Sequence, residues 1–278
     1  MTVFGEFFEH NNFGGDSYTA ELTNNWRYWW VKFGGDLRNE ISSMRARAYG
    51  GRSGNAYGFT RNDFLGDMAA LNMGENWTCW WSSLGSDMND DIESGLLINR
   101  SDDETELNMK DLLGAAFADA FDEATQGTQV SRRGDPKIYS VFWPSWDSDR
   151  KFVRIEQDMR VELDWWPDYD AQVQYDIYFY VSGGEVHAYV ARIRTWVEGG
   201  IFSGSINDEL HPQMVDGADD LDEQLENGLA LLNLLGALGG GFTGVYLLPG
   251  NPPNMTPPAG NFGRMGSAYE NSTVVLRT

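Results

Sequence analysis

The chain has little of the chemistry on which most enzymes and disulfide-linked proteins depend. Its 278 residues include one cysteine, Cys79, and three histidines. One cysteine cannot form a disulfide within the chain, and the histidines lack the H-E-x-x-H spacing of a zinc site. Neither a G-x-S-x-G nucleophile motif nor a phosphate-binding loop occurs. We therefore expect a protein that is not an enzyme, with Cys79 buried and unreactive.

Positive charge is also scarce. Lys and Arg number 20 against 42 Asp and Glu, for a net charge of −22. Residues 1–100 hold 8 of the basic and 13 of the acidic residues, so most of the acidity lies in residues 101–278. Such a surface repels nucleic acids and anionic membranes, and we expect neither as a partner. Two interpretations of the acidity stay open: it keeps the protein in solution, or it attracts cations.

No targeting or membrane-spanning segment is expected. The first ten residues lack the basic start and apolar run of a signal peptide, so a cytoplasmic protein and a processed secreted one both remain open. The longest apolar stretch, residues 228–248, is interrupted by Asn233 and by three glycines at 239–241. We expect a buried helix that ends at these glycines, followed by a core strand. Membrane insertion after a conformational change is the alternative.

Part of the sequence occurs twice. "NWRYWW" at residues 25–30 is followed 51 positions later by "NWTCWW" at residues 76–81. The same shift aligns "FEHNNFGGD" (8–16) with "FTRNDFLGD" (59–67) and "GDLRNEISS" (35–43) with "SDMNDDIES" (86–94). Three blocks that agree on one ungapped offset indicate a duplicated unit.

Glycines divide these first hundred residues into short pieces rich in aromatic residues, which is typical of strands and turns. Two units of about four strands predict an all-β sandwich with Greek-key connections, one motif in residues 1–50 and one in 51–100. We expect the tryptophans of the two blocks to pack mostly in the core and at its corners. An exposed aromatic surface for a ligand is the alternative.

The repeated hairpin carries a resemblance. An aromatic residue, four residues, Phe, one residue and Gly occur in "FEHNNFGG" and again in "FTRNDFLG". Each copy is followed by a polar loop, "RNEISS" at residues 38–43 and "NDDIES" at residues 89–94. This order resembles the βγ-crystallin superfamily, in particular its microbial calcium-binding members, over residues 1 to about 100.

The resemblance implies a calcium ion at each loop. Calcium takes six to eight oxygen ligands, and polar loops of this kind also occur as ordinary turns. Because its side chains carry more carboxylates, we expect the second loop to bind more tightly. Two positions depart from the family pattern. Arg38 stands where the pattern has Asn or Asp, and Glu93 stands where it has Ser or Thr. The implied ligands are Asn39, Glu40 and Ser42 with Thr60 of the other hairpin, and Asn89, Asp90, Asp91 and Glu93 with Glu9.

Residues 101–278 predict an α+β domain of no recognised family. "SDDE" at residues 101–104 is a capping box that predicts a helix start and the domain boundary. Gly127 is the predicted stop of that helix. Its expected inner face consists of Met109, Leu112, Leu113, Ala116, Phe117, Ala120 and Phe121.

Apolar and polar residues then alternate with period two, which predicts an antiparallel meander with one apolar face and one charged, solvated face. Its strands are expected at residues 138–143, 152–166, 171–181 and 185–197, with "SGG" as a tight hairpin turn. A second helix should pack Leu221, Leu225, Leu229, Leu232 and Leu235 inward. Residues 242–248 and 272–277 add strands around the proline-rich loop 249–260. Asp164, Asp168 and Asp170 are expected to form a solvated turn rather than a cation site.

Three functions remain open. The first is a non-enzymatic calcium-binding protein whose acidic second domain binds an unknown ligand. The second is a secreted effector, namely a toxin, a membrane-active protein or a protease inhibitor. The third is a carbohydrate-binding module that uses exposed tryptophans.

Overall fold

The chain folds into two compact units. The computed structural model describes residues 2–23, 26–51, 53–74, 76–85, 88–100, 103–143, 150–164, 167–199, 202–250 and 263–278. Unit 1 comprises Met1–Glu104, Val141–Arg150 and Gly250–Glu270, and unit 2 comprises Thr105–Ser140, Lys151–Pro249 and Asn271–Thr278. The chain therefore returns to unit 1 twice after the predicted boundary near residue 101.

Unit 1 is built from short antiparallel strands, as the glycine-broken aromatic pieces predicted. The first repeat contains β1 (Thr2–His10), β2 (Gly14–Thr23), β3 (Tyr28–Lys32) and β4 (Ser43–Tyr49). The second contains β5 (Ser53–Phe59), β6 (Asp67–Met73), β7 (Thr78–Trp81) and β8 (Ser94–Arg100). A later strand, β15 (Gly263–Ser267), pairs with β6 and was not expected from the sequence.

The two repeats exchange their third strands. One sheet has the order β2-β1-β4-β7 and the other the order β15-β6-β5-β8-β3. Within each repeat the second, first and fourth strands lie side by side. The third strand pairs instead with the fourth strand of the other repeat, so that β3 pairs with β8 and β7 with β4. Neither sheet is therefore complete without both repeats.

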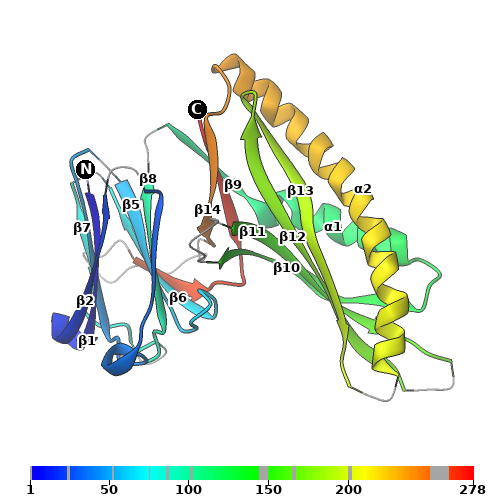
Figure 1. The fold of residues 1–278 in the computed structure, drawn as a ribbon, viewed down its shortest axis with the longest axis horizontal. Coiled ribbons are helices and arrows are strands. Elements are labelled where there is room, and N and C mark those ends of the chain that lie inside the picture. The colour runs from blue at the N-terminus through cyan, green and yellow to red at the C-terminus, as the bar shows by residue number, and fades with distance from the viewer. Residues whose placement is uncertain are drawn as a thin grey trace. The chain divides into compact units, whose positions relative to one another are not determined.

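The core of unit 1 lies between these two sheets (Figure 1). Phe7 of β1 meets Phe33 edge-on at 5.0 Å between ring centroids. The sheets approach closely at two glycines: a Cβ on Gly5 would lie 2.4 Å from Leu97 Cδ2, and one on Gly95 would lie 2.7 Å from Phe7 Cζ. Only glycine allows backbone to approach side chains this closely, so these two positions determine the spacing of the layers.

The prediction that the repeated tryptophans pack mostly in the core and at its corners holds for only part of them, since Trp29 packs against the core and Trp30 is half-buried. Trp81 is buried, but the equivalent pair Trp26 and Trp77 is 68% and 49% exposed, and Trp80 is 38% exposed. Trp26 and Trp77 precede β3 and β7 rather than lying in them. Within β7 successive side chains alternate between the two faces, so Cys79 and Trp81 point inward and Trp80 outward.

Cys79 is buried as expected. Its thiol donates to the Asn72 carbonyl at 3.1 Å, and burial raises the pKa of Cys79 to about 11. A thiol with so high a pKa forms little thiolate near neutral pH and is a poor nucleophile.

Unit 2 is a four-stranded sheet with two helices and a smaller sheet. The first sheet has the order β10 (Val130–Trp143), β11 (Arg150–Val161), β12 (Tyr169–Ser182) and β13 (Glu185–Val197). The second sheet has the order β14 (Gly244–Pro249), β16 (Ser272–Arg277) and β9 (Glu104–Asn108). The helices are α1 (Met109–Thr125) and α2 (Ser203–Leu238). Consecutive strands of the first sheet lie side by side in chain order, as the alternating sequence predicted.

The predicted start of the first helix is wrong. Residues 104–108 form β9, and the helix begins at Met109. Its N-cap is Asn108, whose side chain accepts from the Asp111 amide at 3.2 Å, because asparagine at this position satisfies an amide that the helix leaves unpaired. Ser101 and Asp102 of the expected capping box lie outside the described residues.

Helix α1 buries only part of its predicted face. Met109, Phe117 and Phe121 are buried, whereas Leu112 and Ala116 are exposed. The helix ends at Thr125, just before the predicted stop at Gly127, whose φ of +78° favours glycine.

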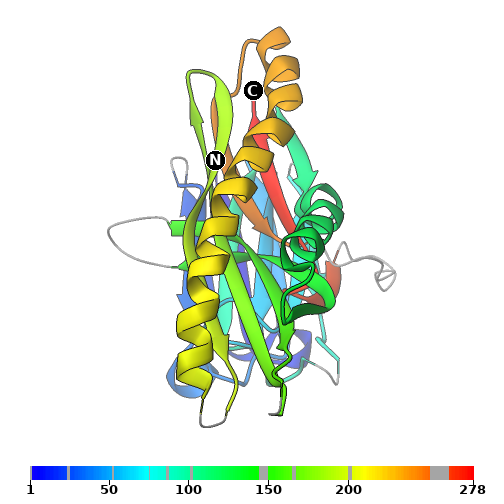
Figure 2. The same cartoon turned by 90° about the vertical axis from the view of Figure 1, so that its right-hand side faces the viewer.

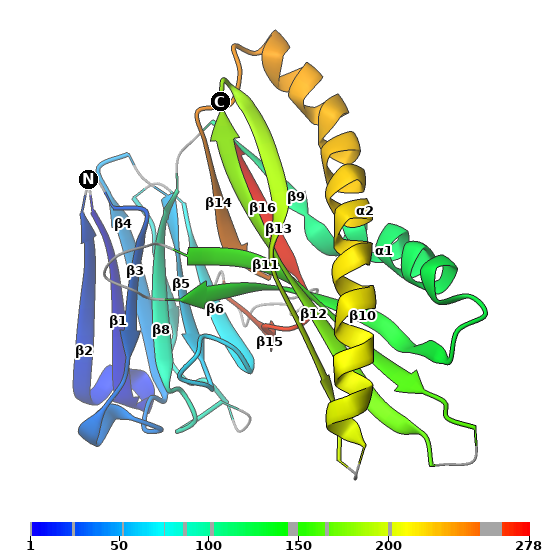
Figure 3. The same cartoon turned by 45° about the vertical axis from the view of Figure 1, so that its right-hand side comes forward.

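Helix α2 runs along the β12–β13 hairpin (Figure 3). Its side chains satisfy backbone groups of β13, the edge strand of the sheet. Asp222 accepts from the Val190 amide at 2.6 Å, and the Asn233 amide both accepts from Val186 N at 2.8 Å and donates to Val186 O at 2.9 Å. An edge strand occupied in this way cannot pair with another chain there.

The expectation of a buried second helix is wrong at its C-terminal end. Leu221, Leu225 and Leu229 are buried as predicted, but Leu235 is 58% exposed and Leu232 is half-buried. Three further leucines of the last turns are exposed, namely Leu231, Leu234 and Leu238. The strand that follows, β14, is a core strand as expected. No helix in the described part of the chain combines the length and the apolar character needed to cross a membrane.

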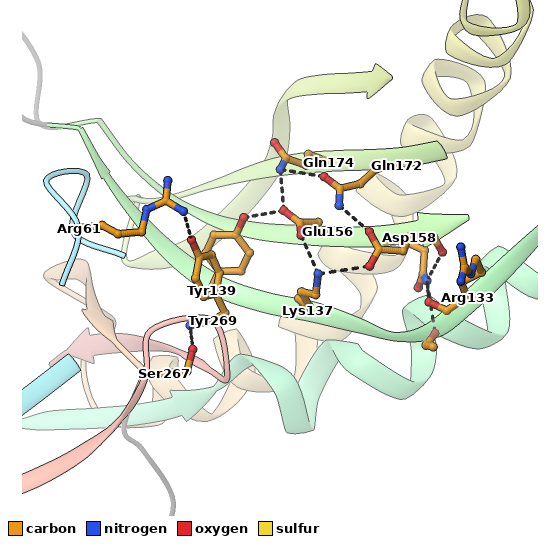
Figure 4. A network of polar contacts seen from close by, with 12 residues as sticks. Arg61, Arg133, Lys137, Tyr139, Glu156, Asp158, Gln172, Gln174, Ser267 and Tyr269 are labelled. Atoms are coloured by element: carbon orange, nitrogen blue, oxygen red, sulfur yellow. Dashed lines mark hydrogen bonds and ion pairs between the residues drawn. The ribbon is translucent and has the colours of Figure 1, made fainter. Parts of the chain in front are cut away.

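The charged face of the four-stranded sheet is partly buried, contrary to the prediction that it is solvated. In Figure 4, Glu156 of β11 accepts from the Tyr139 hydroxyl at 2.8 Å, from Gln174 at 2.7 Å and from Lys137 at 3.1 Å. Burial is the main reason that the pKa of Tyr139 is raised far above its usual range. Each of these four side chains has a partner, which is the condition for burying polar groups.

The most buried charge on this face is Asp176 of β12, which is 1% exposed. Arg154 of β11 binds it through two hydrogen bonds of 2.6 and 3.0 Å, and Arg192 of β13 binds it from the other side, with its Nε at 2.8 Å. Burial alone would raise the pKa of Asp176, but the two guanidinium groups outweigh burial and hold it below the usual range. Asp176 therefore joins three neighbouring strands.

We predict that Asp176→Asn lowers the free energy of unfolding by about 3–5 kcal/mol, because it leaves two guanidinium groups without their anion. Urea unfolding of the full chain measures the change. A lowered pKa in the folded state gives stability that is present above the unfolded value near 3.8 and is lost as the pH falls below it. The difference in the free energy of unfolding between the wild type and Asp176→Asn should therefore shrink below about pH 4.

Asp168→Asn is the matched control for this experiment. It removes the same charge from the pair with Arg160, which is much more exposed. It should change stability by less than about 1 kcal/mol. Equal losses in the two variants would contradict a special role for Asp176.

Candidate functional site

Two polar loops of unit 1 are joined crosswise at the end of the β sandwich. The first loop is residues 38–43 and the second is residues 89–94. The Asn39 amide donates to the Ile92 carbonyl, and the Asp90 amide donates to the Ile41 carbonyl, both at 3.3 Å. The two bonds are related by the repeat offset, because Asn39 corresponds to Asp90 and Ile41 to Ile92. A side chain of one loop can therefore reach the other.

The loops share an unusual backbone conformation. Asn39 and Asp90 have φ of +59° and +63°, in the left-handed region. Asn and Asp tolerate this region better than other side chains, which explains why these residue types occur at the two positions. The repeat is therefore a repeat of conformation as well as of sequence.

Each loop is tied to the first hairpin of its own repeat. The Ser42 amide donates to the Phe8 carbonyl at 2.9 Å, and the equivalent Glu93 amide donates to the Phe59 carbonyl at 2.8 Å. These bonds place the first loop beside the hairpin that carries Glu9, and the second loop beside the hairpin that carries Thr60.

The side chains of Glu9 and Thr60 have equivalent roles. Glu9 Oε2 accepts from the Asp16 amide at 2.8 Å, and Thr60 Oγ1 accepts from the Asp67 amide at 2.9 Å. Each side chain therefore closes its own hairpin.

The two loops form a cluster of oxygen atoms around Asp90. The Ser42 hydroxyl donates to Asp90 Oδ1 at 2.7 Å, and Asn89 Nδ2 donates to Asp90 Oδ2 at 2.7 Å. Asn89 Oδ1 is buried and has no hydrogen-bond donor in the described structure. We call these three residues the Asp90 cluster. It contains a carboxylate, a hydroxyl and a buried amide oxygen that lacks a partner.

The pseudo-symmetric position contains a cation of the protein itself. Arg38, the equivalent of Asn89, forms an ion pair with Glu93, the equivalent of Ser42, at 3.0 Å. Arg38 is 53% exposed at its side chain and Glu93 only 17%. The carboxylate of Glu93 is thus already neutralised, and we call this pair with Asn39 the Arg38 cluster.

The remaining predicted ligands lie outside both clusters. Glu40 and Asp91 are exposed, and no hydrogen bond or ion pair of the described residues joins them to either cluster. The structure thus brings Ser42, Asn89 and Asp90 together and pairs Glu93 with Arg38 instead. This crosswise pairing was not predicted from the sequence, although the 51-residue offset is consistent with a two-fold relation between the repeats.

The donor atoms decide which cluster suits a hard cation. Calcium and similar ions take carboxylate, hydroxyl, amide and carbonyl oxygens. The Asp90 cluster offers three of these types, and the unpaired Asn89 Oδ1 is free to accept a cation. The Arg38 cluster does not fit, because a guanidinium repels an ion at short range. Within the described ranges no three Asp, Glu, His or Cys side chains group into a metal site, so an ion at Asp90 would depend on neutral oxygens as well.

Comparison with known proteins gives no relative. No protein-family model, curated protein or solved structure matches the chain.

The equivalence of the loops can be tested without any ligand. Ser43 and Ser94 are fully buried, and their hydroxyls donate to the carbonyls of His10 at 2.7 Å and Arg61 at 2.6 Å, which are also 51 positions apart. We predict that Ser43→Ala and Ser94→Ala each lower the free energy of unfolding by about 0.5–1.5 kcal/mol, because each removes the hydrogen bond that a fully buried hydroxyl donates to the hairpin of its own repeat. Urea unfolding measures both.

Ser83→Ala is the control, since Ser83 is exposed and bonds only locally. It should change stability by less than about 0.5 kcal/mol. If only one of the two buried serines matters, the two loops are not equivalent.

Proposed function

We propose that residues 1–100 are a calcium-binding domain of the βγ-crystallin type and that the protein acts by binding rather than by catalysis. The Asp90 cluster carries this proposal. It combines a carboxylate with neutral oxygens from two loops, and one of these oxygens is buried without a donor.

The strand order supports the crystallin part of the proposal. In a Greek key, a fourth strand returns to lie beside the first. Here β4 lies beside β1 and β8 beside β5. The hairpin motif, the tryptophan block and the polar loop follow one another in the same order in both repeats.

We propose one calcium ion per chain, at the Asp90 cluster. Asp90 and the amide oxygen of Asn89 would hold it, with Ser42 from the first loop. In the structure, Ser42 and Asn89 donate hydrogen bonds to the Asp90 carboxylate. In the Arg38 cluster the guanidinium takes the place of an ion, so this half needs none.

Such an ion would stabilise the folded domain, since it joins loops of both repeats that separate on unfolding. The linkage is about 2.7 kcal/mol when calcium exceeds its Kd a hundredfold. A domain with this property is suited to a structural or calcium-responsive role.

The test compares two adjacent carboxylates. Asp90→Asn should weaken calcium binding at least about tenfold, because ligand charge sets affinity at such sites, and asparagine still tolerates the left-handed backbone. Asp91→Asn removes the same charge from an exposed residue outside the cluster and should leave the affinity nearly unchanged. Calorimetry on the full chain measures the affinity and stoichiometry, and melting curves in calcium and in chelator measure the stabilisation.

Arg38→Asn provides the reverse experiment. It introduces the residue type found at the equivalent position 89 and releases Glu93 from its ion pair. The stoichiometry should rise from one ion to two. Identical wild-type melting curves in calcium and in chelator, or equal effects of the two aspartate variants, would reject the proposal.

Carbohydrate binding is a second candidate function, and it is favoured by the exposure of Trp26 and Trp77 at equivalent positions. Exposed aromatic faces that lose little entropy on binding are good contact surfaces. If this function is correct, the chain should bind members of a glycan array, and Trp26→Ala with Trp77→Ala should abolish that binding. Retention of binding by the double variant would exclude these tryptophans.

A further inference from the structure

Unit 2 contains a groove between its two helices. The groove has a volume of about 560 Å³, within the 300–1,000 Å³ usual for small-molecule sites. Both helices contact the same residue of the sheet: Phe117 of α1 meets the Tyr175 ring edge-on at 5.7 Å, and the Tyr175 hydroxyl donates to the Met214 carbonyl of α2 at 3.2 Å. The helices therefore lie on one side of β12 (Figure 2), and residues of both helices line the groove.

The floor of the groove is apolar and aromatic. Phe117, Phe121, Tyr175, Met214 and Leu221 line it, and each is less than one-tenth exposed. The polar end of Tyr175 is already bonded to the Met214 carbonyl. A ligand that reaches this floor therefore meets rings and methyl groups.

Small residues keep the groove open. Gly217 lines it from within α2, and a Cβ on Gly217 would meet no atom within 4 Å. Ala120 and Ala124 line it from α1. A glycine inside a helix costs about 0.5–1 kcal/mol relative to alanine, so α2 is less stable here than it could be, in a place where a side chain would project into empty space.

The rim of the groove carries charge of one sign. Glu123 of α1 and Asp220 and Glu223 of α2 line it, and none of the lining residues is Lys, Arg or His. None of these three carboxylates forms an ion pair within the described ranges. Helix α2 has eight Asp and Glu residues and no Lys or Arg along its whole length.

We infer that this groove binds an amphipathic organic cation, a small molecule with an aromatic or alkyl body and an ammonium group. The apolar body contacts the floor, where burial supplies the affinity. The ammonium group lies toward the carboxylates of the rim, and the aromatic rings of the floor also attract cations. An anion of the same shape is repelled by the same carboxylates. This site lies in unit 2 and does not depend on the calcium proposal.

The test uses three probes with one body and three charges. We expect 4-phenylbutylamine to bind the full chain at least tenfold more tightly than 4-phenylbutanol, and 4-phenylbutyrate to bind most weakly. Raised salt should weaken the amine and leave the alcohol unchanged. Calorimetry gives the affinities, and amide chemical shifts locate the binding site.

Two variants test the location. Gly217→Leu projects a side chain into the groove from a position where a Cβ meets no atom within 4 Å, and it should abolish binding of the amine. Gly217→Ala, the control, adds one methyl group and should retain binding. Both should melt at or above the wild-type temperature, because both favour the helix. The double variant Asp220→Asn with Glu223→Gln should lower the affinity of the amine to that of the alcohol and leave the alcohol unaffected.

Three results would overturn the inference. The first is equal affinity for the three probes, or no binding of the amine at millimolar concentration. The second is unchanged binding in Gly217→Leu. The third is binding of tetralysine as tight as that of the amine, since tetralysine has charge without an apolar body and would report the acidity of the chain alone.

Discussion

The exchange of third strands between the repeats is the constraint on which unit 1 depends. Because β3 completes the sheet of the second repeat and β7 the sheet of the first, one repeat alone would leave two incomplete sheets and an open core. The same exchange brings the ends of both sheets together, so that the two polar loops cross there. The core and the candidate ion site are therefore products of one arrangement.

Unit 2 depends on buried ion pairs and on side-chain contacts to its edge strand rather than on strand exchange. Its long strands carry many charges, and the sheet buries some of them by pairing, as Asp176 does with arginines on both neighbouring strands. Its edge strand β13 is occupied by side chains of α2. The position of α2 is thus determined by polar contacts to the strand edge as well as by its buried leucines.

Local patterns predicted much of the fold. The 51-residue repeat, the short strands of unit 1, the meander of unit 2 and the buried part of α2 all follow from spacing and alternation. The predictions that were wrong concerned features that depend on residues far apart in the sequence. The capping box at residues 101–104 was a valid local signal, but residues 104–108 are taken up by a strand. Trp26 and Trp77 lie just before β3 and β7, the strands that the two repeats exchange, and the start of these strands was not visible in the local pattern.

The candidate site was predictable as a list of residues and not as an arrangement. Ser42, Asn89 and Asp90 were each expected as ligands from the polar loops. Their meeting follows from the pairing of Asn39 with Ile92 and of Asp90 with Ile41, which no local pattern contains. The same holds for Arg38 and Glu93, whose departure from the loop pattern was visible but whose contact with each other was not.

The pairing of β15 with β6 has a consequence for the order in which the chain folds as it is made. Strand β6 is complete at Met73, whereas its partner begins at Gly263. A ribosome that adds about 5–20 residues per second needs roughly 10–40 s to make the intervening residues. During this time the outer edge of β6 has no partner from its own chain, and an unpaired strand edge is a site at which other chains can add. Nascent chains on a crowded polysome can therefore associate with one another at this edge until β15, in the last segment of unit 1 to be synthesised, closes it.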